Sequence, residues 1–285
     1  MKRESHRAPA DRPQAASGAD QARAGGGEFA AELELARAAA LEAGDILRRH
    51  FRERGFEVNS KGHDNPVTTA DLEADRALRE RLGGAFPEYG WLSEETADDG
   101  ARLARRRVWI VDPLDGTKEF IKGIPEFVVA IALAEDGVPV LGVTYNPVKR
   151  EMFWAARGAG CHLDGERVRV TAAAGLARAV VLASRSETAR GEWKAYKDQL
   201  IVNPIGSVAY KLALVAAGKA DATFTRTPKS EWDIASGAAL LAEAGGVMTD
   251  IHGHPLRFNR RHVRLEGFIA AGPELHAALS KLVMK

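Results

Sequence analysis

The sequence has a single cysteine among 285 residues, which excludes an intrachain disulfide and a cysteine metal cluster. We interpret Cys161 as a small buried thiol with no redox role. Hydrophobic runs are also short, and none approaches the roughly 18 uninterrupted apolar residues of a membrane-spanning helix. Residues 1–27 carry charges but no apolar run of the kind found in secretory signals. We therefore expect a soluble cytoplasmic protein.

An excess of charge of either sign is lacking as well. The chain has 40 Lys and Arg against 39 Asp and Glu, for a net charge of +1. A protein that binds duplex nucleic acid is expected to show a concentrated basic face, because phosphate neutralisation dominates that affinity. We interpret the two short arginine runs, 105–107 and 260–261, as solvated ends of loops or helices. We expect neither a nucleic-acid polymer nor a membrane as partner.

Composition separates a tail from a folded part. Residues 1–27 are rich in Ala, Gly and Pro and lack apolar periodicity, so we predict a disordered tail. The rest is long enough to bury a substantial core, as one large domain or two modest ones. We expect an N-terminal α+β part at 28–173 that binds metal, and a C-terminal α/β part at 174–285 that completes the site.

The first half indicates two helices and then a sheet. Apolar residues recur at helical spacing over 29–51, and a second helix is predicted over 69–82, with Thr68 or Thr69 available to cap its start. Apolar runs separated by Gly, Asp or Pro turns follow, which predicts a largely antiparallel sheet. Its strands are expected at 107–112, 127–133, 138–145 and 151–156.

After residue 175 strands and helices alternate, which predicts an α/β protein of stacked layers with a smaller, mixed second sheet. A helix closed by Gly245-Gly246 and a final helix that starts with a proline are typical boundaries. The elements expected are strands at 180–183, 222–224 and 268–271, and helices at 208–218, 232–244 and from Pro273.

The most informative motif follows the strand at 107–112. This strand ends in two carboxylates, Asp112 and Asp115, separated by a proline and a leucine. Proline stiffens the bend, so the two carboxylates can converge on one point. Gly116 permits close backbone approach, and the N–H groups of Gly116 and Thr117 at a helix start can hold an anion such as phosphate.

Haloacid-dehalogenase-type phosphatases offer an alternative, since they carry an Asp-x-Asp-Gly-Thr sequence whose first aspartate becomes phosphorylated. Here the acids are three positions apart, so the two-residue separation that aims both side chains into that pocket is absent. The motif also lies far along the chain, after two predicted helices. We favour carboxylates that ligate metal over an aspartyl-phosphate nucleophile.

Two further acidic segments have simple interpretations when taken alone. Glu94-Glu95 fits a solvated loop, and Asp233 fits a helix-start acid stabilised by the helix dipole. Neither segment is specific by itself.

Together, Glu94-Glu95, the segment 112–117 and the segment 232–235 resemble the lithium-sensitive, magnesium-dependent inositol monophosphatase superfamily in order and rough separation. The resemblance covers roughly residues 29–272. Residues 112–122 are most similar to the bacterial 3′(2′),5′-bisphosphate nucleotidase branch, the CysQ proteins. The resemblance implies an αβαβα sandwich of the sugar-phosphatase type, a phosphomonoesterase, and a monomer or homodimer.

The resemblance also implies roles for individual residues. Asp71 would orient Thr117, and Thr117 and Glu94 would position the attacking water. Glu95 would support these residues without contacting the metal itself. Oxygen ligands of this kind suit Mg²⁺, and paired ions can stabilise both the entering and the departing oxygen of a phosphoryl transfer. The implied ligands of two or three Mg²⁺ ions are Glu94, Asp112, the Leu114 carbonyl, Asp115 and Asp233, with Asp112 as the bridge.

Substrate contacts are less clearly indicated. In the nucleotidase branch the segment matching 206–211 contributes a serine and a lysine to the substrate phosphate; Lys211 fits, while Ala209 is more similar to inositol phosphatases. Inositol phosphatases carry an acid seven residues before the Trp-Asp aspartate, where this chain has Arg226, which suits a second phosphate. Both cations are equally well explained as solvated residues. The substrate contacts expected are Asp115, Gly116, Thr117, Lys211, Arg226 and Asp233.

Our hypothesis is hydrolysis of 3′-phosphoadenosine 5′-phosphate to AMP and phosphate. Inositol 1-phosphate, histidinol phosphate and fructose 1,6-bisphosphate are alternatives within the same fold. An alternative of another class is a catalytically idle metal- or phosphate-binding protein that acts in regulation. Thr117 argues against it, because a binding module needs no hydroxyl that positions water.

Overall fold

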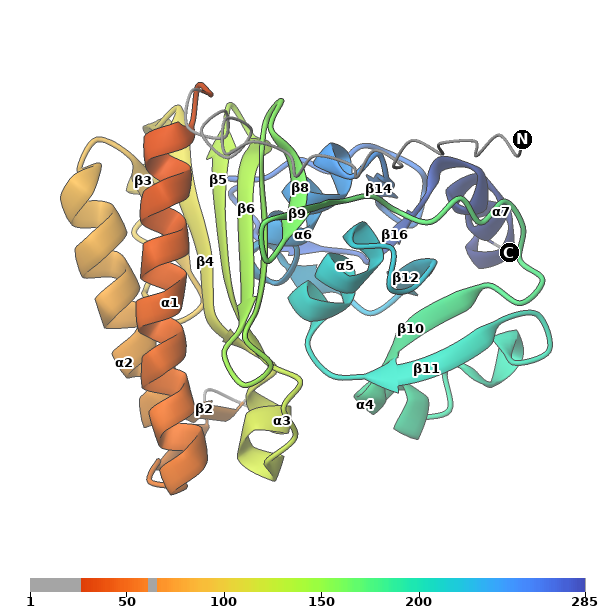
Figure 1. Cartoon of the computed structure of the whole chain (residues 1–285), viewed down its shortest axis with the longest axis horizontal. Coiled ribbons are helices and arrows are strands. Elements are labelled where there is room, and N and C mark those ends of the chain that lie inside the picture. Colours follow the sequence, from red (N-terminus) through yellow and green to blue (C-terminus); the bar gives the residue numbers. More distant parts are fainter. Residues whose placement is uncertain (1–26, 61–65, 285) are drawn as a thin grey trace, which may run out of the picture.

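The computed structural model describes residues 27–60 and 66–284. The tail predicted at 1–27 lies outside the described residues, apart from Gly27. Layers follow one another in the order helix, sheet, helix, sheet, helix (Figure 1). This order confirms the predicted αβαβα sandwich.

Two helices form the first layer. α1 (Ala30–Glu53) and α2 (Thr69–Leu78) cover one face of the larger sheet, and their apolar sides are buried against it. The periodicity that predicted α1 is the physical cause, because Leu33, Ala36 and Leu47 are all fully or almost fully buried. Thr68 caps α2, as predicted, and a π-helical turn at Arg79–Gly83 continues the chain to the predicted end.

The larger sheet has seven strands in the order β3-β4-β5-β6-β7-β8-β9. All neighbours are antiparallel except β3 and β4, so the predicted antiparallel character is confirmed with one parallel pair at the edge. The strands are β3 (Gly90–Ser93), β4 (Arg107–Asp115), β5 (Val128–Glu135), β6 (Val138–Asn146), β7 (Glu151–Ala156), β8 (Gly160–Leu163) and β9 (Glu166–Val168).

The middle layer consists of α5 (Val208–Ala216) and α6 (Glu231–Glu243), which pack between the two sheets. α6 approaches β6 closely at Gly142, where a Cβ atom would lie 2.4 Å from the carbonyl oxygen of Ser236. Thr144 donates a hydrogen bond of 3.1 Å to the Ser236 hydroxyl at the same place. The absence of a side chain at Gly142 therefore lets α6 lie directly on the sheet.

The second sheet has five strands in the order β11-β10-β12-β16-β14, and it is mixed as predicted. α7 (Pro273–Val283) covers its outer face, where Leu275 and Leu279 join the core. α4 (Arg185–Ala189) follows β10 directly. The strands are β10 (Val180–Ser184), β11 (Ile201–Ile205), β12 (Ala222–Thr225), β14 (Val247–Thr249) and β16 (Phe268–Ala271).

Short elements complete the described chain. Two antiparallel ladders join β1 (Val58–Ser60) to β2 (Pro66–Thr68) and β13 (Lys229–Ser230) to β15 (Arg264–Leu265). Short 3₁₀ turns occupy Ala101–Ala104 and Lys194–Tyr196.

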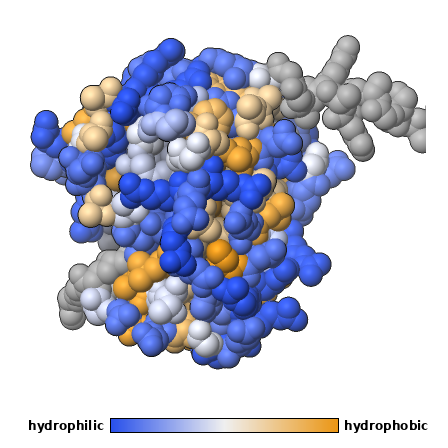
Figure 2. Space-filling model, turned by 90° about the vertical axis from the view of Figure 1, so that its left-hand side faces the viewer, coloured by the Kyte–Doolittle hydropathy of each residue, from blue (hydrophilic) through white to orange (hydrophobic). Residues whose placement is uncertain are grey.

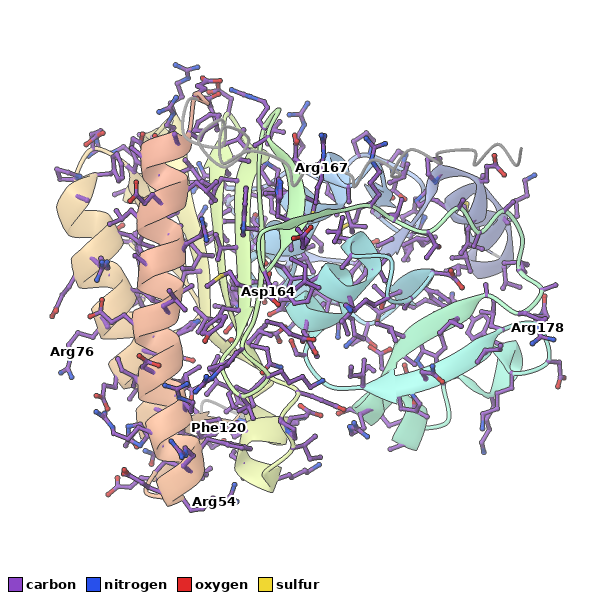
Figure 3. The ribbon with its side chains drawn as sticks, viewed as in Figure 1. Arg54, Arg76, Phe120, Asp164, Arg167 and Arg178 are labelled. Atoms are coloured by element: carbon purple, nitrogen blue, oxygen red, sulfur yellow. The ribbon has the colours of Figure 1, made fainter. Side chains whose placement is uncertain are left out.

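α3 (Thr117–Lys122) is fixed against the first layer by Arg54 at the end of α1. The guanidinium donates hydrogen bonds of 3.3 Å and 2.6 Å to the carbonyl oxygens of Phe120 and Ile121. Phe120 packs between rings of the core, with Phe127 5.0 Å away centroid to centroid. Figure 3 shows Arg54 and Phe120 near each other at the same end of α1 and α3.

The outer surface is mixed in polarity. Figure 2 shows the face formed by the first helical layer, where hydrophobic residues are interspersed among hydrophilic ones. Single exposed leucines such as Leu41 on α1 and Leu72 on α2 are ordinary features of a folded surface. Across the described ranges, no helix combines the length and apolar character that crossing a membrane requires.

Candidate active site

Several elements end or begin at one cavity of about 450 Å³. The end of β4 and the starts of α3, α4, α5 and α6 all contribute to its lining. Helix starts expose N–H groups that have no partner within the helix, so this convergence gives the cavity many hydrogen-bond donors. Four of the predicted metal ligands contribute side chains to the lining: Glu94, Asp112, Asp115 and Asp233.

The end of β4 places two of these acids. The pairing of β4 with β5 is regular up to Asp112 and resumes at Asp115 with a shift in register. The backbone N–H of Leu114 donates a hydrogen bond of 3.0 Å to Asp112 Oδ1 within this irregular segment. Gly116 follows with φ of 107°, a value that favours glycine, and the chain turns there into α3. The motif therefore folds as a local bend that faces both acids into the cavity.

Parallel pairing brings Glu94 to the same place. β3 runs parallel to β4, and the N–H of Glu94 donates a hydrogen bond of 3.3 Å to the carbonyl of Val111. The carboxyl ends of parallel neighbours meet at one edge of a sheet, so the residue after β3 lies beside the end of β4. Glu94 is thus not in a detached loop, contrary to its simplest interpretation from sequence.

The start of α6 supplies Asp233. Its Oδ2 accepts a hydrogen bond of 2.8 Å from the N–H of Ser230, as part of a capping box at this helix start. The side chain also lines the cavity. Asp233 therefore has both of the roles weighed from the sequence, since it caps the helix and belongs to the acidic cluster.

Glu94, Asp112 and Asp233 form a compact cluster, in which one oxygen from each lies within 4.8 Å of the others. Burial, with the charges of Glu94, Asp115 and Asp233, raises the pKa of Asp112 well above its usual range. Burial and the charges of Asp115 and Glu94 raise the pKa of Asp233 to about 7. Hard oxygen donors brought together at this cost fit a magnesium ion, which would relieve their repulsion.

Asp115 is held by the start of α5. Its Oδ2 accepts hydrogen bonds from the Ser207 hydroxyl at 2.7 Å and from the N–H of Ala209 at 2.5 Å. Burial raises the pKa of Asp115, and these two donors oppose the rise. Ser207 has φ of 57°, which is uncommon for a residue other than glycine. A strained backbone at Ser207 thus directs its hydroxyl to Asp115.

Thr117 and Asp71 lie in the predicted relation. The Thr117 hydroxyl lies 3.2 Å from Asp71 Oδ1 and 3.2 Å from the carbonyl oxygen of Leu114. Asp71 is 1% exposed, and its Oδ2 accepts hydrogen bonds from both the backbone N–H and the hydroxyl of Thr68. The capping box of α2 therefore fixes the orientation of Asp71, and Asp71 in turn can orient the Thr117 hydroxyl.

Cations line the same cavity as the acidic cluster. Lys211 is 4% exposed, so it is no solvated helix residue, and its Nζ donates a hydrogen bond of 2.7 Å to the Ser207 carbonyl. Burial lowers the pKa of Lys211 to about 8. Lys229 Nζ lies 3.4 Å from Glu187 Oε1. Arg185 forms an ion pair with Glu126, and its side chain also lines the cavity.

Arg226 is placed differently from the expectation. It is exposed and is not part of the cavity lining, because the chain turns outward after β12 ends at Thr225. Lys229 and Arg264 line the cavity instead, and neither was singled out from the sequence. The position of Lys229, four residues before Asp233 in the segment that leads into α6, was the available signal for it.

Comparison with known proteins agrees with this geometry. The model of the inositol monophosphatase family matches residues 30–285. The inositol-1-monophosphatase of Rhizobium meliloti is 39% identical over 225 residues, which cover 75% of this chain and 84% of that protein. The histidinol-phosphatase of Chlorobaculum parvum is 35% identical over 228 residues, 78% of this chain and 86% of the other.

A solved structure shows the same fold. The extragenic suppressor protein SuhB of Bartonella henselae superposes with a TM-score of 0.79 at 32% identity, covering 90% of this chain and 99% of that one. Phosphatases of the matching family use Mg²⁺, in agreement with the oxygen donors of the acidic cluster. The more specific resemblance to the nucleotidase branch stays a prediction. From its sequence, its fold and its site, this chain is a phosphatase that belongs to the inositol monophosphatase family.

Proposed function

We propose that the cavity hydrolyses a small phosphate monoester that carries a second phosphate, with 3′-phosphoadenosine 5′-phosphate as the preferred substrate. The observation that carries the proposal is that one cavity is lined both by an acidic cluster, here called the acidic side, and by cations, here called the cationic side. Glu94, Asp112 and Asp233 line the same cavity as Lys211 and Lys229. A substrate with one phosphate on each side would use both.

The acidic side would hold Mg²⁺ through Glu94, Asp112, Asp115, Asp233 and the Leu114 carbonyl. Bound there, Mg²⁺ would supply Lewis-acid stabilisation of phosphate oxygens. The Thr117 hydroxyl donates to Asp71, so it would accept a hydrogen bond from the attacking water and in this way fix its direction. The N–H groups of Gly116 and Thr117 at the start of α3 point donors at the phosphate to be cleaved.

Charge balance favours a substrate with more than one phosphate. Five cationic and five acidic side chains line the cavity. Bound Mg²⁺ would neutralise the metal ligands, and Glu119 would then be the remaining carboxylate. Burial raises the pKa of Glu119, which further reduces negative charge on this side. Lys229 pairs with Glu187 and Arg185 pairs with Glu126, so the remaining positive excess is modest. This excess still suits a polyanion better than a monoester of a neutral polyol. The cationic side chains are Lys118, Arg185, Lys211, Lys229 and Arg264.

Inositol 1-phosphate is the second candidate, because the relative from Rhizobium meliloti is named an inositol-1-monophosphatase. Arg226 stands where inositol phosphatases are expected to carry an acid, and the structure places it outside the cavity. No acid from that position therefore reaches a polyol hydroxyl. This difference favours the bisphosphate over the inositol ester.

Steady-state kinetics with excess Mg²⁺ test the proposal directly. We expect kcat/KM for 3′-phosphoadenosine 5′-phosphate to exceed that for inositol 1-phosphate by at least about tenfold, which corresponds to roughly 1.4 kcal/mol of preference. Histidinol phosphate and fructose 1,6-bisphosphate serve as comparison substrates. Faster turnover of the inositol ester would leave the metal site intact as an assignment and contradict the substrate. The cytoplasmic location and the monomeric or dimeric state stay predictions.

A further inference from the structure

A second cavity of about 320 Å³ lies next to the first. It is formed mainly by the segment 255–266, between β14 and β16. Arg257, Arg260 and Arg264 all line it, and Arg264 lines the catalytic cavity as well. The two cavities are thus adjacent and share one guanidinium.

Within the part of the chain that the structure describes, none of the three guanidinium groups forms an ion pair, although the charge of Arg260 also acts on the buried carboxylate of Glu231. Over residues 27–60 and 66–284 their side chains make no hydrogen bond or ion pair with a carboxylate. The two acids of this cavity face histidines instead: Asp250 Oδ2 is 3.1 Å from His254 Nδ1, and Glu266 Oε2 is 3.4 Å from His252 Nε2. All three arginines are exposed, so their guanidinium groups are accessible to an anion from solution.

The backbone beneath these arginines is held by buried charges. Glu231 is 0% exposed, and its two oxygens accept hydrogen bonds from the N–H groups of Asn259 at 2.6 Å and Arg260 at 2.9 Å. Arg102 is 2% exposed and donates to Asn259 Oδ1 at 2.7 Å and to the Arg260 carbonyl at 2.9 Å. A surface loop fixed this firmly presents its side chains from a rigid base.

The loop is also tied to the catalytic cavity. In the ladder of β13 and β15, Arg264 pairs with Ser230. Ser230 lies three residues before Asp233 in the sequence. The N–H of Glu231 donates a hydrogen bond of 2.9 Å to the Val263 carbonyl. The backbone that carries Arg264 is therefore continuous with the start of α6, which carries Asp233.

We propose that Arg257, Arg260 and Arg264 form a second anion site, which binds a phosphate or diphosphate group at the mouth of the catalytic cavity. Guanidinium groups bind phosphate oxygens in pairs, and a loop whose backbone is already held loses little backbone entropy on binding. The run 260–261, interpreted from the sequence as a solvated loop end, thus belongs in part to a binding site. The site itself goes beyond the proposed function, while its use by a substrate rests on that function.

Binding of inorganic pyrophosphate to metal-free protein tests the site, because the acidic cluster without Mg²⁺ repels the probe. The variant is Arg257→Gln/Arg260→Gln, which leaves Arg264 in the catalytic cavity unchanged. The matched control is Arg76→Gln/Arg79→Gln, which removes the same charge from α2 and from the π-helical turn that follows it. Both control residues are exposed, and Figure 3 shows Arg76 pointing away from the fold. Calorimetry should show affinity about tenfold or more weaker in the variant and within about twofold of wild type in the control. Equal binding by variant and control would overturn the proposal.

Two sources of the anion are then distinguished by kinetics with excess Mg²⁺. If the anion is part of the substrate, the variant should lower kcat/KM for a nucleotide with a 3′-phosphate and a 5′-diphosphate. It should leave kcat/KM for the corresponding 5′-monophosphate near the wild-type value. If a separate anion supplies it, added pyrophosphate changes the rate of inositol 1-phosphate hydrolysis in wild type but not in the variant. Both results support the site. A protein that hydrolyses no nucleotide would contradict the proposed substrate, while the calorimetric result would still decide the anion site.

Discussion

The two sides of the catalytic cavity are built differently. On the acidic side, Asp112 and Asp233 extend from a buried strand and a buried helix, and burial raises the pKa of both. On the cationic side, Lys229 and Arg264 extend from a ladder of two residues each, and Arg185 begins a five-residue helix. The acidic side is set by the core of the fold, whereas the cationic side, apart from the buried Lys211 of α5, is set by short segments. Such segments can change without disturbing the core, so we infer that they set substrate choice.

The largest effect is expected from the acidic side. Asp112→Asn removes the charge that would bridge the metal ions, and turnover should fall by at least about a thousandfold. The melting temperature without metal should stay the same or rise, because a desolvated charge has been removed from the core. Measured kcat and thermal unfolding of the same preparation check both results. A variant that retains wild-type kcat would falsify the assignment of the metal site and leave the idle-binder hypothesis open.

Removal of the metal should destabilise the fold, because the acidic cluster then loses the cations that balance its charge. The folded-state pKa of Asp233 is about 7, above its ordinary value of 3.8, so this group opposes folding progressively as pH rises from about 4 to 7. Chelation should therefore lower the melting temperature by several degrees at pH 7.5 and much less at pH 5.5. Calorimetric scans with EDTA and with excess Mg²⁺ at both pH values measure the difference. Equal scans with and without metal at pH 7.5 would show that no metal organises the cluster.

Thr117 tests the geometry between the two sides. Thr117→Val removes the hydroxyl that lies 3.2 Å from Asp71 Oδ1 while preserving volume. We expect kcat to fall by about a hundredfold, the scale of a lost positioning group, with a small change in KM. Thr117→Ser is the matched control, since it restores the hydroxyl, and it should retain most of the activity. Similar activity in the valine and serine variants would exclude the hydroxyl from the reaction.

The cationic side should control KM more than kcat. Lys229→Gln should raise KM for 3′-phosphoadenosine 5′-phosphate by about tenfold and alter that for inositol 1-phosphate by at most about twofold. Glu187 loses its cation in this variant, so thermal unfolding is measured in parallel, and Lys229→Arg serves as the control that keeps the charge. An equal rise in KM for both substrates would show that Lys229 does not recognise the second phosphate.

The same contrast explains what could be predicted from the sequence. β4 was predictable because a continuous apolar run ends in acids, and Asp112 and Asp115 lie where that run ends. Thr68 and Ser230 each precede a helix with an acid three residues later, which is a local signal for a helix start. Features of this kind depend on neighbouring residues along the chain. The site roles of Asp71 and Asp233 came from the family resemblance.

The remaining features depend on distant pairing. β3 was missed because four residues carry little periodicity, and its strand character comes from parallel pairing with β4. β11 was missed because it is an edge strand with mostly exposed residues and a proline. Lys229 and Arg264 reach the cavity only through the ladder between β13 and β15, which joins segments far apart in the sequence. The substrate side of the site was therefore the part least accessible to sequence reasoning.

The smallest expected effect concerns His276, which lies outside the cavity. Its contribution to stability falls as the pH decreases, whereas that of the metal-free acidic cluster rises. His276 is 9% exposed, its Nε2 is 3.0 Å from the Thr249 hydroxyl, and burial lowers its pKa. The unfolded chain therefore takes up a proton near pH 6.5 that folded His276 does not, so stability falls as pH decreases through that value. Carboxylates with lowered pKa, such as Asp98 and Glu135, act only near pH 4, so they do not interfere above pH 5.5. Glu231 acts in the opposite direction over the same interval, because burial raises its pKa to about 7. The contribution of His276 is therefore measured by comparison: with Mg²⁺ bound, lowering the pH from 7.5 to 5.5 should change the melting temperature less favourably in wild type than in His276→Gln. Without Mg²⁺ the acidic cluster adds a stabilising change over this interval, because its charges, which oppose folding at pH 7.5, are relieved at pH 5.5. An identical pH dependence with and without Mg²⁺ would contradict the contrast between the two regions.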